Sequence, residues 1–194
     1  MYTSAMKYHF INEEIPYTGR ELNNHWIYRN FGILGDAVVA FAGSCEVDQT
    51  NMVDLEDILN NDYIYSKKML NFIVEIFGIN LQEGVLLQRL FSSIIQDRIN
   101  AMSDKAHIKR RGDDLFYQDT AKLSVSICTL SPTSILIHTG LNIDAQGAPV
   151  EASGLASELG MDDHIETLAM ACMRTLAEEW ADIRLSCCKV KAVV

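Results

Sequence analysis

RRGDDLFYQDTAKLSVSI at residues 110–127 and SILIHTGLNIDAQGAP at residues 134–149 are the most informative stretches of this sequence. The first begins as a basic turn that contains a glycine and two acids, and it leads into a hairpin. Apolar and polar residues alternate over Leu123–Thr129, a pattern typical of a β-strand. Pro132 ends this strand, and the same alternation over Ser134–Ile143 predicts the next one.

Small polar residues share one face of each predicted strand: Ser124, Ser126 and Cys128 on the first, and His138, Gly140 and Asn142 on the second. Small side chains let a ligand approach a sheet closely. Lys122, at the start of the first strand, would supply a point charge for a phosphate or a carboxylate. We therefore expect one face to pack and one to bind a ligand. The same pattern also fits a surface hairpin with solvated charges.

The hydrophobic pattern on either side of these strands predicts an α+β fold. Further strands are expected at Ala37–Ala42 and Met69–Phe77, and helices at Val53–Tyr63, Val85–Ile99 and Asp163–Leu185. Asp163 and Glu166 resemble a capping box at the start of the last helix. The expected architecture is a mostly antiparallel sheet backed by helices. Because no linker or internal repeat divides the chain, residues 1–194 are expected to form a single domain.

The charge of the chain limits its partners. It has 194 residues, 48% of them hydrophobic, and 16 basic against 26 acidic residues give a net charge of −10. This balance argues against broad nucleic-acid binding, because the mean field would repel phosphates. Five basic residues nevertheless fall within eighteen positions: Lys105, Lys109, Arg110, Arg111 and Lys122. A local anion site is therefore compatible with an acidic chain.

Cysteine and histidine spacing proposes neither a disulfide framework nor a metal site. The five cysteines include no C-x-x-C pair, and the five histidines are scattered. We expect Cys128 to face the ligand side as a buried, inert thiol. No apolar run is long enough to cross a bilayer and no leader pattern is seen, so a cytoplasmic location without membrane association is expected.

The two central stretches resemble the core of biotin protein ligases in order and spacing, from Val85 to Pro149. That core reads Lys-Trp-Pro-Asn-Asp, a hairpin, Lys-Leu-Ala-Gly-Ile-Leu, a strand Gly-Ile-Gly-Ile-Asn-Val and a downstream proline. HWIYRNFGILGDAVVAF at residues 25–41, together with RRGDDLF and KLSVSI, identifies the whole chain as a member of an uncharacterised archaeal and bacterial family, the domain of unknown function numbered 366. That family resembles the biotin/lipoate ligase and class II aminoacyl-tRNA synthetase superfamily in fold.

The resemblance implies roles for matching residues. Lys122 falls on the ligase lysine that contacts the acyl carboxylate and the adenylate phosphate, and Arg110 replaces the first lysine of the motif. Asp113 and Asp114 fall on the Asn-Asp pair beside the nucleotide. The strand residues Gly140 and Asn142 match the second glycine and the asparagine, and Ser124, Ser126 and His138 join the implied ligand-binding set. His138 stands where the ligases have glycine and would narrow the pocket.

A further arginine and glycine loop precedes the first predicted buried strand. Arg29, Gly32 and Gly35 in RNFGILGD are loosely similar to the arginine and glycine loop of lipoate ligases, and they are candidate ligand contacts. A tight turn before a strand explains the same spacing. The Gly-Arg-Gly-Arg loop of biotin ligases is absent, which argues against biotin as the substrate.

Three functions follow from these features. The first is an ATP- and magnesium-dependent ligase or acyltransferase that activates a small carboxylate, with Lys122 and Arg110 as catalytic cations. The second is a non-catalytic module that binds a small anionic or planar metabolite or a nucleotide on the same fold. The third is an interaction protein that forms a homodimer through its sheet or its long helix.

Overall fold

The computed structural model describes residues 5–105, 107–148 and 150–193. Pro149, where the similarity to the ligase core ends, lies outside these residues. The main sheet has five strands in the order β1-β2-β3-β8-β7: Lys7–Ile11, Ala37–Val47, Ile64–Phe77, Ser134–Asp144 and Ser124–Leu130. Only β1 and β2 pair in parallel among these strands. The prediction of a mostly antiparallel sheet is therefore confirmed.

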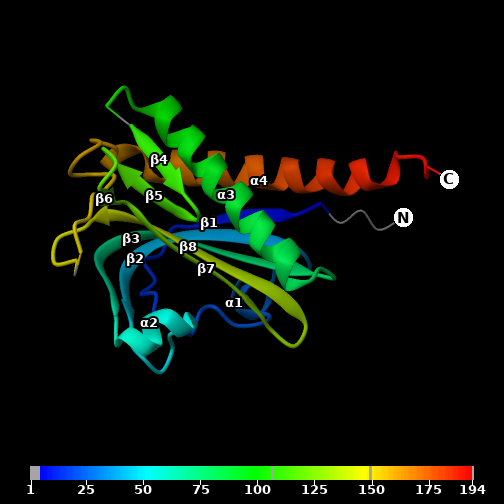
Figure 1. The fold of residues 1–194 in the computed structure, drawn as a ribbon, viewed down its shortest axis with the longest axis horizontal. Helices are drawn as coiled ribbons and strands as arrows, with labels where there is room; N and C mark the ends of the chain where they lie inside the picture. Colours follow the sequence, from blue (N-terminus) through cyan, green and yellow to red (C-terminus); the bar gives the residue numbers. More distant parts are fainter. Residues whose placement is uncertain (1–4, 106, 149, 194) are drawn as a thin grey trace.

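Helices cover both faces of the sheet (Figure 1). Two long helices, α3 (Leu81–Met102) and α4 (Ile165–Cys188), pack on one face, and two short helices, α1 (Trp26–Phe31) and α2 (Leu55–Asn60), lie on the other. Each face has its own hydrophobic core. The α+β fold with a sheet backed by helices is thus confirmed. No helix in the described part of the chain combines the length and apolarity needed to cross a membrane.

The long helices form where hydrophobic spacing predicts them. Leu168, Cys172, Leu176 and Trp180 of α4 are buried against the sheet, as a 3.6-residue period requires. The predicted capping box is wrong. Asp163 lies within a 3-10 turn, η1 (Asp162–His164), and α4 begins directly after this turn with His164 rather than Asp163 at its N-cap. A capping box does begin α3, where the Asn80 side chain and Glu83 bond each other's backbone N–H groups.

The shorter elements differ from the prediction at their ends. β2 and β3 continue well beyond the apolar runs at Ala37–Ala42 and Met69–Phe77, because their pairing continues to Val47 and Ile64 through residues of which several are exposed and polar. α2 is shorter than Val53–Tyr63, and the Asp54 side chain caps its first turn by accepting a hydrogen bond from the Glu56 N–H.

A second, three-stranded sheet forms the hairpin that follows α3. Its strands are β4 (Ile108–Arg111), β5 (Asp114–Tyr117) and β6 (Ala121–Lys122). The chain then enters β7 directly, so this small sheet continues into the edge strand of the main one. The arrangement places the RRGDD turn and Lys122 at the edge of the main sheet.

The register between β7 and β8 corrects the predicted ligand face. Ser126 pairs with Thr139, whereas Ile127 pairs with His138. Paired residues share a face, so Ser124, Ser126 and Cys128 face the α3 side, whereas His138, Gly140 and Asn142 face the opposite side. The small residues of the two strands therefore point to opposite faces of the main sheet.

Candidate functional site

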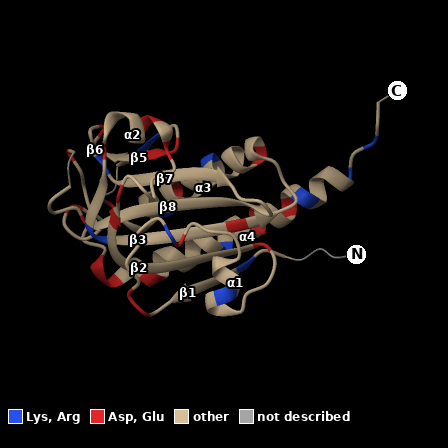
Figure 2. Ribbon diagram, turned by 90° about the horizontal axis from the view of Figure 1, so that it is seen from below, with Lys and Arg blue, Asp and Glu red and all other residues tan. Residues whose placement is uncertain are grey.

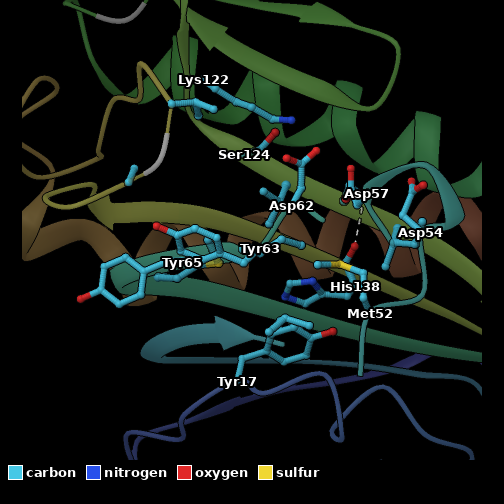
Figure 3. A pocket seen from close by; sticks show the side chains of 18 of the residues that line it. Tyr17, Met52, Asp54, Asp57, Asp62, Tyr63, Tyr65, Lys122, Ser124 and His138 are labelled. Atoms are coloured by element: carbon cyan, nitrogen blue, oxygen red, sulfur yellow. Dashed lines mark hydrogen bonds between the residues drawn. The ribbon is translucent and has the colours of Figure 1, made fainter. Parts of the chain in front are cut away.

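A cavity of about 540 Å³ opens beside the sheet where β3 begins and β8 ends. It lies between the sheet, the α2 segment and the edge of the small hairpin sheet (Figure 3). Aromatic and apolar residues form much of its lining, including Tyr17, Met52, Tyr63, Tyr65, Met69, Val125 and Ile127. This size and composition are typical of a site for a small molecule.

Tyr17 and His138 form the floor of the cavity. Their rings stack with centroids 3.7 Å apart and an angle of 11° between planes, and each residue is only 3% exposed. The Met69 side chain lies beside them, and it occupies the space that a side chain at Gly140 would need. Gly140 thus shapes the floor by leaving room for Met69, although it is not among the lining residues.

The hydrogen bonds of His138 fix its tautomer. Asn71 donates through Nδ2 to the Met69 carbonyl at 3.3 Å, so its Oδ1 accepts from His138 Nε2 at 3.0 Å. Burial lowers the pKa of His138 to about 3. The imidazole is therefore neutral at pH 7 with its proton on Nε2, which leaves Nδ1 as a hydrogen-bond acceptor.

Lys122 is the only lysine or arginine among the described residues that line the cavity. Its backbone is held on both sides, because Lys122 N–H donates to Glu151 and its carbonyl accepts from Ser153 N–H. Asn142 Nδ2 also donates to this carbonyl at 3.3 Å. The Nζ atom lies 3.1 Å from Asp114 Oδ2. Lys122 and Asn142 thus come together at the cavity.

Asp114 and Asp113 stand beside Lys122 in different environments. Burial raises the pKa of Asp114, and the attraction of Lys122 opposes this shift without cancelling it. Asp113 accepts from Gln88 Nε2 at 2.9 Å and lies 3.1 Å from Arg89 Nη1. The two carboxylates predicted to lie beside a nucleotide therefore do line the cavity, and each already has a partner.

Gln88 and Arg89 are site-supporting residues that the sequence pattern does not reveal. The helical stripe places both outside the apolar face of α3, yet Gln88 is 3% exposed and also donates to Ser126 Oγ at 3.0 Å. Arg89 packs across the turn at Gly112, where φ is +67° and a side chain would collide with the guanidinium. Only the hairpin's return onto α3 brings these residues together.

The serines of β7 act as structural hydrogen-bonding groups. Ser124 Oγ accepts from Leu115 N–H at 2.8 Å, and Ser126 Oγ donates to the His138 carbonyl at 3.1 Å. Both serines lie at the border of the cavity. Cys128 packs against the hydrophobic core on the α3 side of the sheet, so the expectation that it faces the ligand side is wrong. Burial raises the pKa of its thiol to about 11, so the thiol is protonated and unreactive at neutral pH.

Arg110 does not line the cavity, which contradicts the prediction of one anion pocket formed with Lys122. Its guanidinium turns back to the Gly112 carbonyl. Lys109 and Arg111 pair with Asp119 on the exposed side of the hairpin, at 2.8 and 3.7 Å. In an antiparallel hairpin, alternate side chains point to opposite faces, and this alternation separates Arg110 from Lys122.

The RNFGILGD segment lies at the other end of the sheet. Arg29 is exposed on α1, Gly32 caps that helix, and neither these residues nor Gly35 lines the cavity. The adjacent Asp36 accepts from Phe77 N–H and from Trp180 Nε1, both at 3.0 Å. The segment therefore forms a turn that ties β3 to α4, in keeping with the turn interpretation.

Carboxylates from the α2 segment face the cavity on the side opposite the sheet. Asp54, Asp57 and Asp62 point toward the space in which Lys122 also lies (Figure 3). Acidic segments gather beside α2 near β5 (Figure 2). Burial raises the pKa of Asp57, and repulsion from Asp54 and Asp62 adds to this shift. The cavity is therefore locally negative, which the basic cluster in the sequence does not predict.

The fold is similar to those of several solved structures. The biotin protein ligase from Aquifex aeolicus in complex with biotin and ATP has a TM-score of 0.55 at 12% identity, covering 91% of this chain and 72% of that chain. Protein Ta0514 from T. acidophilum with bound lipoic acid has a TM-score of 0.55 at 11% identity, covering 91% and 95%. The chain thus has the biotin/lipoate protein ligase fold, which is class II synthetase-like.

Within this class, the chain belongs to the family described as Domain of unknown function (DUF366), which matches residues 6–191. Uncharacterized protein MJ0805 from Methanocaldococcus jannaschii is 38% identical over 167 residues, or 83% of this chain and 74% of the relative. A solved Protein of Unknown Function from Pyrococcus horikoshi has a TM-score of 0.87 at 38% identity and covers 97% of this chain and all of its own. The expected family and fold are confirmed.

Buried His138 makes stability depend on pH. In the folded protein its pKa is about 3, whereas the ordinary value in an unfolded chain is 6.5. The unfolded state therefore binds one more proton between these pH values, so the free energy of unfolding falls by about 1.4 kcal/mol for each unit of pH decrease there. In His138→Phe this dependence is absent, and we expect the variant to gain stability relative to the wild type from pH 6 to pH 4.

Urea unfolding of both proteins across this pH range measures the difference. Loss of the hydrogen bond to Asn71 lowers the stability of His138→Phe by an amount that does not depend on pH. The test therefore compares how steeply the free energy of unfolding changes with pH in the two proteins. Parallel stability curves for the two proteins would show that His138 is not buried in its neutral form.

Proposed function

We propose that this protein uses ATP to activate a small carboxylic acid bound in the cavity. The observation that carries the proposal is the position of Lys122, at the border of a cavity with an aromatic floor. Structural neighbours with the same fold include a ligase solved with biotin and ATP and a protein solved with lipoic acid, which support this reaction class. The fold by itself does not specify an activity.

The chemistry of activation explains why a fixed cation is needed. A carboxylate oxygen of the acid attacks the α-phosphorus of ATP, and the bond from that phosphorus to the departing pyrophosphate breaks. Negative charge accumulates where the two anions meet, and a positioned ammonium group lowers the free energy of the transition state. Lys122 would hold the carboxylate and the α-phosphate together at this point.

Asp114 sets the resting state of this lysine. In the protein alone, Asp114 neutralises Lys122 across 3.1 Å. Burial already disfavours the ionised form of this carboxyl, as its raised pKa indicates. An incoming anion would therefore exchange with Asp114 for the ammonium group, so that Lys122 stays paired before and during the reaction.

The carboxylates at the turn suit a magnesium ion that arrives with ATP. Magnesium bound to nucleotide phosphates usually takes one or two protein carboxylates and retains water molecules. Asp113 and Asp114 both line the cavity, and Asp114 is paired with the lysine. Among the described residues, no group of three or more potential ligands is arranged as a preformed metal site. The ion would neutralise phosphate charge, while the protein residues orient the reactants.

A binding module without catalysis is the second candidate. It is favoured by the position of Arg110, which turns away from the cavity and leaves Lys122 as its sole lining lysine or arginine among the described residues. One cation is enough to hold an anionic metabolite, whereas adenylate formation brings two anions together. Native mass spectrometry separates the two candidates: a binding module retains an unmodified small molecule after purification and shows no turnover.

The direct test of the enzymatic proposal is acid-dependent exchange of labelled pyrophosphate into ATP. Purified protein is incubated with ATP, magnesium and individual small carboxylic acids, and thermal unfolding is followed in parallel. Activation predicts exchange with at least one acid and a raised melting temperature with ATP and magnesium. A folded protein that shows neither effect across the panel does not carry out this reaction.

A further inference from the structure

We infer that the acid bound in this cavity also carries a protonated amine, which faces the α2 carboxylates while its carboxylate faces Lys122. This inference rests on the proposed function and names the substrate class of the same site. It distinguishes this protein's ligand from an acid that has no charged group besides its carboxylate, such as biotin or lipoic acid. The charges, the hydrogen-bonding groups and their placement around the cavity each support it.

The first argument is the balance of charge on the lining. Five aspartates line the cavity with Lys122: Asp54, Asp57, Asp62, Asp113 and Asp114. Asp113 pairs with Arg89, and Asp114 pairs with Lys122. Asp54, Asp57 and Asp62 take part in none of the ion pairs found among the described residues. The α2 side therefore offers negative charge that no ion pair among the described residues neutralises.

The second argument is the floor, which is independent of the acidic residues. His138 is 3% exposed and presents Nδ1, an acceptor for which no donor exists in the described part of the chain. Tyr17 is equally buried, and its hydroxyl makes no hydrogen bond with any described residue. His138 lines the cavity, so its Nδ1 would accept a hydrogen bond from a ligand that brings a donor, such as an ammonium group.

The third argument is the position of the opposite charges. Lys122 is near enough to Asp57 to lower the pKa of that carboxyl, yet burial and the neighbouring acids still raise it overall. A cation between Lys122 and α2 would relieve this repulsion, whereas an acid without an amine would add to it. A zwitterion places a negative group at the lysine and a positive group at the aspartates.

The test compares acids that differ only in the amine. Binding to the 194-residue protein is measured by calorimetry, without ATP so that no activation occurs, for 5-aminopentanoate against pentanoate and for 6-aminohexanoate against hexanoate. Glycine, 3-aminopropanoate and 4-aminobutanoate complete a series of increasing separation between the two charges. We expect at least one member to bind ~10-fold more tightly than its matched acid, because only the amine can form a charge-assisted hydrogen bond with the α2 carboxylates.

Two variants of α2 locate the effect. Asp57→Asn removes one facing carboxylate and is expected to reduce the preference for the amine at least ~3-fold. Glu56→Gln removes a carboxylate of the same helix that does not line the cavity and should leave the preference unchanged. An equal loss in both variants would mean that long-range charge, rather than contact in the cavity, causes the preference.

The outcomes separate this inference from the proposed function. If matched acids without an amine bind as tightly as the amino acids, or if no amino acid binds, the inference is wrong, and exchange with any acid still supports activation. If amino acids bind selectively but no acid supports pyrophosphate exchange, the ligand class stands and the activation reaction does not.

Discussion

Lys122→Ala is expected to lower the rate of acid-dependent pyrophosphate exchange by ~100-fold or more, because removal of a group that stabilises transition-state charge has effects of this order. Lys109→Ala is the matched control. Its ammonium group lies 2.8 Å from Asp119, and Lys109 is not among the residues that line the cavity. We expect Lys109→Ala to retain the wild-type exchange rate, since an exposed ion pair contributes little.

The Lys122 variant also leaves Asp114 without its partner, which could lower stability. The double variant Lys122→Ala/Asp114→Asn removes both charges, and circular dichroism and thermal unfolding show whether each protein is folded. A folded double variant should remain inactive. If Lys122→Ala were folded and exchanged pyrophosphate at the wild-type rate, Lys122 would not be the catalytic cation, and the proposed geometry would be wrong.

Gly43→Ala is expected to lower the free energy of unfolding by about 2–4 kcal/mol. A side chain at this position of β2 would collide with the backbone carbonyl of Ile15, which cannot move independently. The segment around Ile15 and Tyr17 runs along the β2 edge, with hydrogen bonds from Ile15 N–H to the Ala42 carbonyl and from Tyr17 N–H to the Ser44 carbonyl. Displacement of this segment would also move the floor of the cavity.

Gly160→Ala separates this collision from the general effect of replacing glycine. Gly160 has φ of +64° and no atom near the position of an added side chain, so its substitution is expected to cost about 1 kcal/mol through backbone conformation alone. Urea unfolding at one temperature compares the two variants. Equal destabilisation would show that the close approach of Ile15 to Gly43 does not constrain the fold.

Local geometry explains why the sequence predicts so much of the fold. The buried stripe of α4 follows the period of a helix, and the short apolar stretches predict strands, although β8 is buried on both faces rather than on alternate residues. Register between strands is not local. Ser126 and His138 therefore appear as members of one polar surface in the sequence, whereas their pairing with Thr139 and Ile127 places them on opposite faces.

In the candidate site, too, some residues can be predicted from local sequence, whereas others depend on contacts between distant segments. The resemblance to the ligase core points to Lys122 and Asn142, and both residues line the cavity. Tyr17 lies in an irregular segment, and its stacking on His138 depends on contact between residues far apart in the chain. Arg89, rather than Arg110, reaches the aspartate turn because α3 packs against the hairpin. Such contacts leave no periodic pattern in the sequence.

Acid-dependent exchange of labelled pyrophosphate into ATP tests the central claim most directly. The wild-type protein, Lys109→Ala and Lys122→Ala are assayed with magnesium, ATP and the series from glycine to 6-aminohexanoate, with the matched acids alongside. Activation of an amine-bearing acid predicts exchange that requires the acid, prefers the amine, persists in Lys109→Ala and is lost in Lys122→Ala. Absence of acid-dependent exchange from the folded wild-type protein across the whole panel would contradict the proposed activity.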